Sequence, residues 1–191
     1  MTTGRLEAFT DAVIAIVITI LVLELKVPHE PELAALRGVV PVFLTYVLSF
    51  VYLGIYWNNH HHMMVLTERV NGKILWANLH LLFWLSLVPF TTAWMGETDF
   101  AASPTAVYGV DLLLAAIAYF ILQTAIIAEE GPESRLRAAL GRDLKGKISP
   151  LLYFAAIPLA FVSPWIALAV YVFVALMWLV PDRRIESAVS E

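Results

Sequence analysis

Six long apolar runs follow one another along the chain, and short polar segments separate them. A helix needs roughly 20 apolar residues, at a rise of about 1.5 Å each, to cross a bilayer. The sequence therefore predicts an all-α integral membrane protein with six transmembrane helices in a single domain, residues 1–191. The predicted spans are residues 6–25, 36–56, 73–94, 106–128, 148–162 and 165–180.

The first run and the last two runs differ from an ordinary span. The first begins near the N-terminus, as a secretory signal does, but Glu24, Lys26 and Pro28 follow it without a small-residue cleavage pattern. We therefore expect an uncleaved helix. The last two runs are short and meet at Ser163-Pro164-Trp165. They predict a shallow helical hairpin, with a re-entrant pair as the alternative.

The composition agrees with a membrane protein and excludes several other classes. Hydrophobic residues make up 60% of the chain, charged residues 15%, and the mean hydropathy is +0.78. The chain has no cysteine, which excludes disulfides and thiolate metal sites. It carries no basic stripe for nucleic acid and no nucleophile or phosphate-loop motif. We therefore expect neither an enzyme nor a bound cofactor.

Lysine and arginine placement predicts the orientation. Ten of the twelve residues fall in segments on one side of the predicted spans, and only Lys26 and Arg37 fall on the other. Cytosolic loops of membrane proteins carry such an excess, so both termini should be cytosolic. The ten are Arg5, Arg69, Lys73, Arg135, Arg137, Arg142, Lys145, Lys147, Arg183 and Arg184.

Asp11 is the polar residue in span one that most needs an explanation. A carboxylate inside a membrane is costly unless it is paired, so Asp11 either ties the helix to its neighbours or handles protons or cations. Asn78 and His80 lie at a similar predicted depth. Trp76 and His80 also share a helix face, at a spacing of i, i+4. These three side chains are the predicted partners.

The run His60-His61-His62 has the composition of a metal site but not the geometry. Consecutive helical residues point about 100° apart, so three in a row cannot hold one ion while helical. We expect a structural or interfacial role for this run, and no metal site.

A stripe on span one carries a second hypothesis. Ile16, Thr19, Ile20 and Leu23 are spaced i, i+3, i+4, i+7, and Asp11 lies well off this stripe. In an isolated bundle the stripe would face the core or lipid, and Thr19 would bond back to the Ala15 carbonyl. Around a symmetry axis it would form apolar rings and one hydroxyl ring, which can gate and coordinate cations.

The segment Arg5-x-x-x-Phe9-Thr10-Asp11 and the apolar run after it resemble the first helix of the transmembrane protein 175 potassium-channel family. That family's signature has serine where this chain has Thr10. The resemblance implies a homotetramer whose first helices line the pore, without the Thr-Val-Gly-Tyr-Gly filter of ordinary potassium channels.

The resemblance also assigns roles to residues. Ile16 would form the narrowest ring, Thr19 the hydroxyl ring and Leu23 a further apolar ring, with Ile20 as an additional lining residue. The signature residues would be structural and would hold span one through polar partners on span three. These structural residues are Arg5, Phe9, Thr10 and Asp11, with Trp76, Asn78 and His80 as the partners.

Together these observations predict a passive cation channel in the bacterial inner membrane, preferring potassium over sodium only weakly. Its partners would be the lipid bilayer, monovalent cations and further copies of the chain. The first rival hypothesis is a proton channel or proton-coupled transporter that uses Asp11 and His80. Two more are a membrane enzyme or haem protein that uses the histidines, and a structural protein without transport.

Overall fold

The computed structural model describes residues 2–141 and 143–179, and this part of the chain contains helices and no strand. The predicted all-α membrane fold is confirmed. Three of the cytosolic arginines predicted from charge, Arg142, Arg183 and Arg184, lie outside the described residues, as does Val180 at the end of the sixth predicted span. The long helices are α1 (Thr3–Leu23), α2 (Val40–Val65), α3 (Gly72–Glu97), α4 (Ala102–Glu130), α6 (Leu144–Val162) and α7 (Pro164–Leu179).

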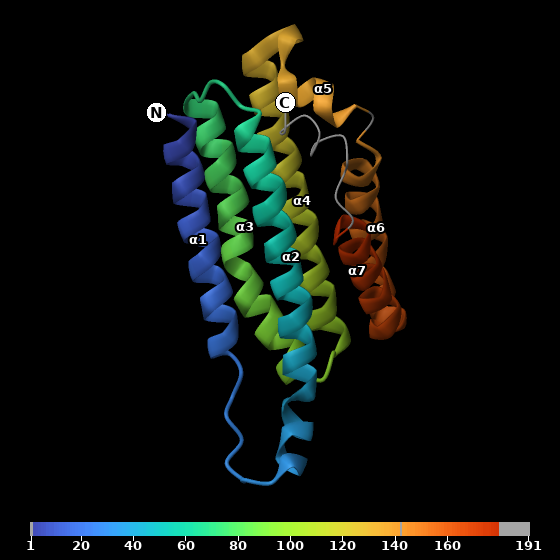
Figure 1. Ribbon diagram of the computed structural model, residues 1–191. Helices are drawn as coiled ribbons and strands as arrows, with labels where there is room; N and C mark the ends of the chain where they lie inside the picture. Colours follow the sequence, from blue (N-terminus) through green and yellow to red (C-terminus); the bar gives the residue numbers. More distant parts are fainter. Residues whose placement is uncertain (1, 142, 180–191) are drawn as a thin grey trace.

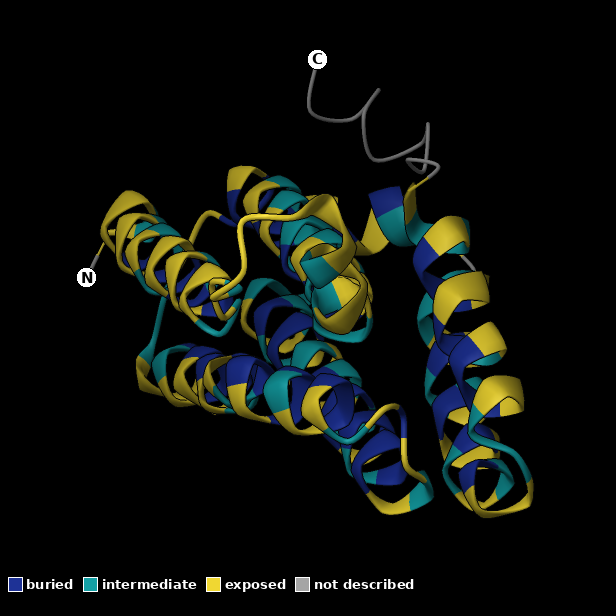
Figure 2. Ribbon diagram, turned by 90° about the horizontal axis from the view of Figure 1, so that it is seen from below, coloured by how far each residue is buried: buried dark blue, intermediate teal, exposed yellow. Residues whose placement is uncertain are grey.

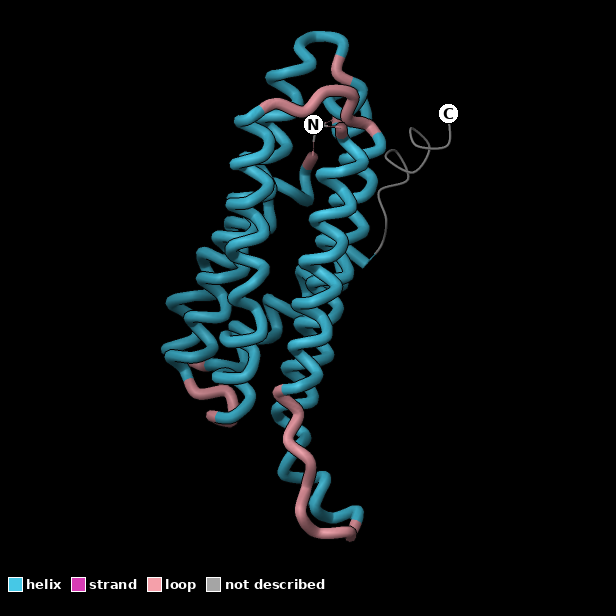
Figure 3. Tube along the Cα trace, turned by 90° about the vertical axis from the view of Figure 1, so that its left-hand side faces the viewer, coloured by secondary structure: helices cyan, strands magenta, loops and turns pink. Residues whose placement is uncertain are grey.

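Short helical segments join some of these helices. The 3-10 helix η1 (Leu33–Val39) leads directly into α2. Together with the loop that follows α1, it forms the connection that projects beyond the bundle in Figure 3. Between α4 and α6 lie the 3-10 helix η2 (Gly131–Glu133) and the helix α5 (Arg135–Leu140). α5 buries Leu136 and Ala139 and exposes its charged side chains, as expected for an amphipathic connector.

The helices run alternately up and down, so their ends gather at two opposite levels. The start of α1, the α2–α3 turn and the α4–α6 connector lie at one end of the bundle, and the connection from α1 to α2 lies at the other (Figure 1). This is the arrangement that the charge distribution predicted. Among the described residues, five helical segments are long and apolar enough to cross a membrane, and α7, with 16 residues, is shorter.

The second helix is longer than predicted. Span two was expected to end at residue 56, whereas α2 continues to Val65 and includes all three histidines. No proline or glycine interrupts the segment after Tyr56, so the backbone stays helical although the side chains become polar. The predicted hairpin turn is confirmed, because Ser163 is extended and Pro164 opens α7.

The bundle has two hydrophobic cores. The first joins α1, α3 and α4 with the C-terminal half of α2, through residues such as Leu21, Leu81 and Leu122. The second joins α2, α4, α6 and α7 and is rich in tyrosine and alanine. α1 packs against α2 and α3 at one edge of the molecule, while the α6–α7 hairpin packs against α4 and α2 at the other (Figure 2).

Gly109 allows the closest approach in the second core. A Cβ atom added there would lie 2.0 Å from the hydroxyl oxygen of Tyr171. That hydroxyl donates a hydrogen bond to the Thr105 carbonyl at 3.1 Å, so the ring has little freedom to withdraw. The small residue is therefore required where α7 meets α4.

We expect Gly109→Ala to lower the unfolding free energy by about 1–3 kcal/mol, because the new methyl group displaces a fixed ring and breaks its hydrogen bond. The measurement is thermal unfolding of the purified protein in detergent. Gly54→Ala on α2 is the matched control, since nothing lies within 4 Å of its added Cβ. Equal melting temperatures for the two variants would contradict this account.

Candidate functional site: the first helix and its supports

α1 has a buried face and an outward face. The predicted stripe lies on the outward face, where Ile16 is 58% exposed and Leu23 78% exposed. Thr19 and Ile20 lie on the same face and are also exposed. The stripe therefore does not belong to the core of the single chain. The buried face is formed by Leu6, Thr10, Ile14, Val17 and Leu21.

Thr19 provides the hydroxyl group on this outward face. It donates a hydrogen bond to the Ile16 carbonyl at 2.7 Å, so the predicted acceptor, the Ala15 carbonyl, is wrong by one residue. Because a hydroxyl oxygen has two lone pairs besides its hydrogen, this bond leaves Thr19 able to accept or to coordinate. The hydroxyl is thus fixed in direction and still has acceptor capacity.

A buried chain of hydrogen bonds ties α1 to α2 and α3, and we call it the polar anchor: Thr10, Asn78 and His60. The Asn78 amide nitrogen donates to the Thr10 hydroxyl at 2.9 Å, and the Asn78 carbonyl oxygen lies 2.9 Å from His60 Nε2. All three side chains are at most 1% exposed. The expected contact of Asn78 with the signature segment is therefore present, and it is consistent with the structural role predicted for Thr10.

The polar anchor also fixes the tautomer of His60. Since the Asn78 amide nitrogen already donates to Thr10, its oxygen must accept, and Nε2 of His60 must carry the proton. His60 Nδ1 is then an acceptor, and it is buried without a hydrogen-bond partner among the described residues. This position agrees with the structural role predicted for the histidine run.

Asp11 is held by a residue that sequence reasoning did not select. Its Oδ1 accepts a hydrogen bond from Trp57 Nε1 on α2 at 3.0 Å. The prediction that Trp76 and His80 are its partners is wrong for the single chain. Trp76 is 75% exposed, and His80 accepts a hydrogen bond from Trp84 on its own helix. Both lie on the outer face of α3, turned away from the polar anchor.

Further contacts fasten α1 at its two ends. Near the N-terminal end of α1, Glu7 Oε1 lies 2.6 Å from His61 Nδ1. Only the spatial arrangement reveals this pair. Beyond the C-terminal end of α1, the Lys26 ammonium donates a hydrogen bond to the Glu97 carboxylate of α3. This hydrogen bond raises the pKa of Lys26. Arg5 is exposed and makes no side-chain hydrogen bond within the described residues, so its structural role stays a prediction.

The polar anchor generates a stability prediction. Asn78→Leu keeps a similar volume but leaves the His60 donor unpaired in the core, so we expect the unfolding free energy to fall by about 1–3 kcal/mol. Thermal unfolding in detergent measures this change. Asn58→Leu on α2 is the control, because Asn58 makes no side-chain hydrogen bond in the described structure. A larger loss from Asn58→Leu than from Asn78→Leu would disprove the importance of the link.

Comparison with known proteins gives a consistent result. Residues 5–89 match the model of a family described as the endosomal/lysosomal potassium channel TMEM175. The chain is 53% identical, over the whole of both chains, to a protein named as a potassium channel from Chryseobacterium sp. (strain P1-3). It is 32% identical to a protein of the same description from Streptomyces collinus, covering 92% of this chain and 90% of the relative.

The fold agrees with these relationships. The crystal structure of a lysosomal potassium-selective channel TMEM175 homologue from Chamaesiphon minutus superimposes with a TM-score of 0.79 at 31% identity, covering 93% of this chain and 96% of the other. The matched region includes α1 with its polar anchor and outward stripe. The chain is therefore a multi-pass membrane protein, and it belongs to the TMEM175 potassium-channel family.

Proposed function

We propose that this protein is a passive potassium channel whose pore is lined by the outward face of α1 from each of several subunits. The observation that carries the proposal is the division of α1 into two faces. One face is fixed to α2 and α3 by the polar anchor, and the other presents an apolar stripe with a hydroxyl at Thr19. The names of the bacterial relatives support potassium as the permeant ion.

The stripe has the chemistry of a gated cation path. Ile16 and Leu23 would form apolar rings, which exclude water when narrow and pass hydrated ions when wide. Thr19 lies between them and would offer hydroxyl oxygens to a partly dehydrated cation, while Ile20 completes the lining. A hydroxyl ring without a cage of carbonyl groups predicts weak selectivity for potassium over sodium.

A pore of this kind requires several chains. One chain supplies a single α1 at the edge of its bundle, and one helix face cannot enclose a channel (Figure 2). Closed rotational symmetry around the exposed stripe would bring equivalent faces together. We propose a homotetramer in the bacterial inner membrane with both termini in the cytosol, consistent with the cationic segments at one end of the bundle.

The rival proton pathway gains no support from the geometry. Asp11 is engaged by Trp57, and His80 is engaged by Trp84 on a different face, so the two residues form no relay within the described chain. We therefore put forward a channel function without catalysis. Potassium acts as the permeant ion, and the mechanism requires no cofactor.

We expect Ile16→Ala to raise potassium flux from proteoliposomes several-fold, because removing branched side chains widens the narrowest ring. Flux is measured with a potassium-sensitive dye after valinomycin calibration of the trapped ion. Val22→Ala serves as the control: Val22 is 47% exposed on the same helix but lies about 120° away from Ile16. No flux from folded wild-type protein, or equal effects of both variants, would refute the proposed constriction.

Thr19→Val tests the hydroxyl ring separately, since valine has nearly the same shape but no oxygen. The potassium-to-sodium flux ratio should fall towards one, while the melting temperature should remain that of the wild type because Thr19 is exposed. Parallel flux assays with potassium-loaded and sodium-loaded liposomes give the ratio. An unchanged ratio would show that Thr19 does not discriminate between the ions.

A further inference from the structure

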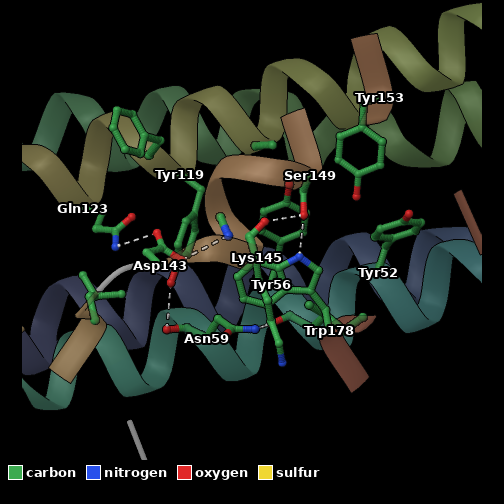
Figure 4. A pocket seen from close by; sticks show the side chains of 15 residues that line it. Tyr52, Tyr56, Asn59, Tyr119, Gln123, Asp143, Lys145, Ser149, Tyr153 and Trp178 are labelled. Carbon is green, nitrogen blue, oxygen red and sulfur yellow. Dashed lines mark hydrogen bonds between the residues drawn. The ribbon is translucent and has the colours of Figure 1, made fainter. Parts of the chain in front are cut away.

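A cavity lies in the bundle away from α1, and none of its lining residues belongs to α1. It opens among α2, α4, α6 and α7, close to the start of α6, and has a volume of about 70 Å³ (Figure 4). This volume is several times the roughly 10–15 Å³ that a cavity needs to admit one water-sized group. The cavity is therefore large enough for a small molecule, and nothing in the proposed channel mechanism uses it.

Aromatic side chains are the largest group in the wall, at six of its fifteen lining residues. Their ring faces carry partial negative charge and attract cations that are weakly hydrated. Tyr56 lines the cavity, and its hydroxyl makes no hydrogen bond among the described residues. The Tyr119 hydroxyl, in contrast, donates to the Asn59 backbone carbonyl at 3.2 Å. The aromatic residues of the lining are Tyr52, Tyr56, Tyr119, Phe120, Tyr153 and Trp178.

Asp143 brings a carboxylate to this aromatic wall. Its Oδ1 accepts from the Gly146 amide at 3.0 Å and caps α6, whereas Oδ2 lies at a longer 3.5 Å from Gln123 Nε2. The backbone of Asp143 is left-handed, with φ of 40° and ψ of 57°, a conformation that costs most residues energy. Asparagine or serine would cap the helix equally well, so capping alone does not require the negative charge.

The wall already accommodates one ammonium group. Lys145 Nζ lies 6.0 Å from the centre of the Trp178 ring, within the range of a cation–π interaction. Trp178 is held in place by a hydrogen bond from its indole nitrogen to the Ser149 hydroxyl at 2.8 Å. The cavity thus combines ring faces that accept cations with a carboxylate whose Oδ2 is only weakly engaged by Gln123.

We propose that this cavity binds a small organic cation with an alkylammonium head, with its charge near Asp143 and its methyl groups against the tyrosine rings. A potassium ion is a poorer match, because aromatic ring faces do not replace its hydration shell. An alkylammonium is weakly hydrated and gains from apolar and aromatic contact. The site lies beyond α2 from the predicted pore, and the proposal does not depend on the channel function.

The test is isothermal titration of purified protein with tetramethylammonium chloride, using potassium chloride as the blank. We expect saturable binding that Asp143→Asn weakens about tenfold, the effect of losing one close charge interaction. Asparagine retains the cap and tolerates the left-handed backbone, so the fold should be preserved. Lys145→Met should tighten binding, because it removes a competing positive charge.

A matched variant separates this site from the pore. Ile16→Ala should leave the affinity for tetramethylammonium unchanged, since it alters only the outward face of α1. Absence of saturable binding to the wild type would overturn the proposal. So would equal affinity in Asp143→Asn together with unchanged affinity in Lys145→Met, because neither charge would then act on the ligand.

The natural source of the ammonium group is either a free solute or a lipid head group. Titration in nanodiscs of phosphatidylcholine and of phosphatidylglycerol distinguishes them, at a salt concentration high enough to screen the surface charge of the anionic lipid. A lower apparent affinity in phosphatidylcholine, whose head group carries the same ammonium chemistry, would assign a lipid as the competing occupant. Equal affinity in both would assign a free solute.

Discussion

The hydrogen bonds among Thr10, Asn78 and His60 determine which way the first helix faces. Inside a bilayer, apolar contact with a neighbouring helix and apolar contact with lipid are nearly equivalent, so hydrophobicity alone does not fix a helix about its own axis. A buried polar link does, because any rotation would leave its donors and acceptors unpaired. With Thr10 inward, Ile16, Thr19 and Leu23 must face outward.

Sequence reasoning predicted what depends on length and period. Long apolar runs indicated the helices, and a 3.6-residue period placed Ile16 and Thr19 on one face of α1 and Asp11 off it. Depth matching brought Asn78 to the right level, but it fixes height and not direction around the helix. His80 and Trp76 were therefore assigned to Asp11, although α3 turns them outward and α2 presents Trp57. Trp57 lies in the C-terminal half of α2, at a predicted depth similar to that of Asp11. That depth was the available signal.

The two cores give the chain two regions with different chemistry. The core around α1 is mostly aliphatic and carries its polar groups in one compact link, which suits a helix that must keep a fixed rotation. The core around α6 and α7 is built from tyrosines packed against alanines, with hydroxyl groups directed to carbonyl oxygens, as Tyr52 is to Tyr171 at 2.6 Å. Rigid rings packed against small residues leave the cavity beside Tyr56.

The unequal fastening of α1 has a mechanical consequence. Its N-terminal half is held by buried hydrogen bonds, while beyond its C-terminal end the Lys26–Glu97 pair is exposed to solvent and screened. A rigid tilt of the helix would therefore pivot near Thr10. At helical rise Ile16 lies about 9 Å from the pivot and Leu23 about 20 Å. In the proposed pore, a small rigid tilt about this point would displace Leu23 about twice as far as Ile16, so the Leu23 ring would widen more than the Ile16 ring.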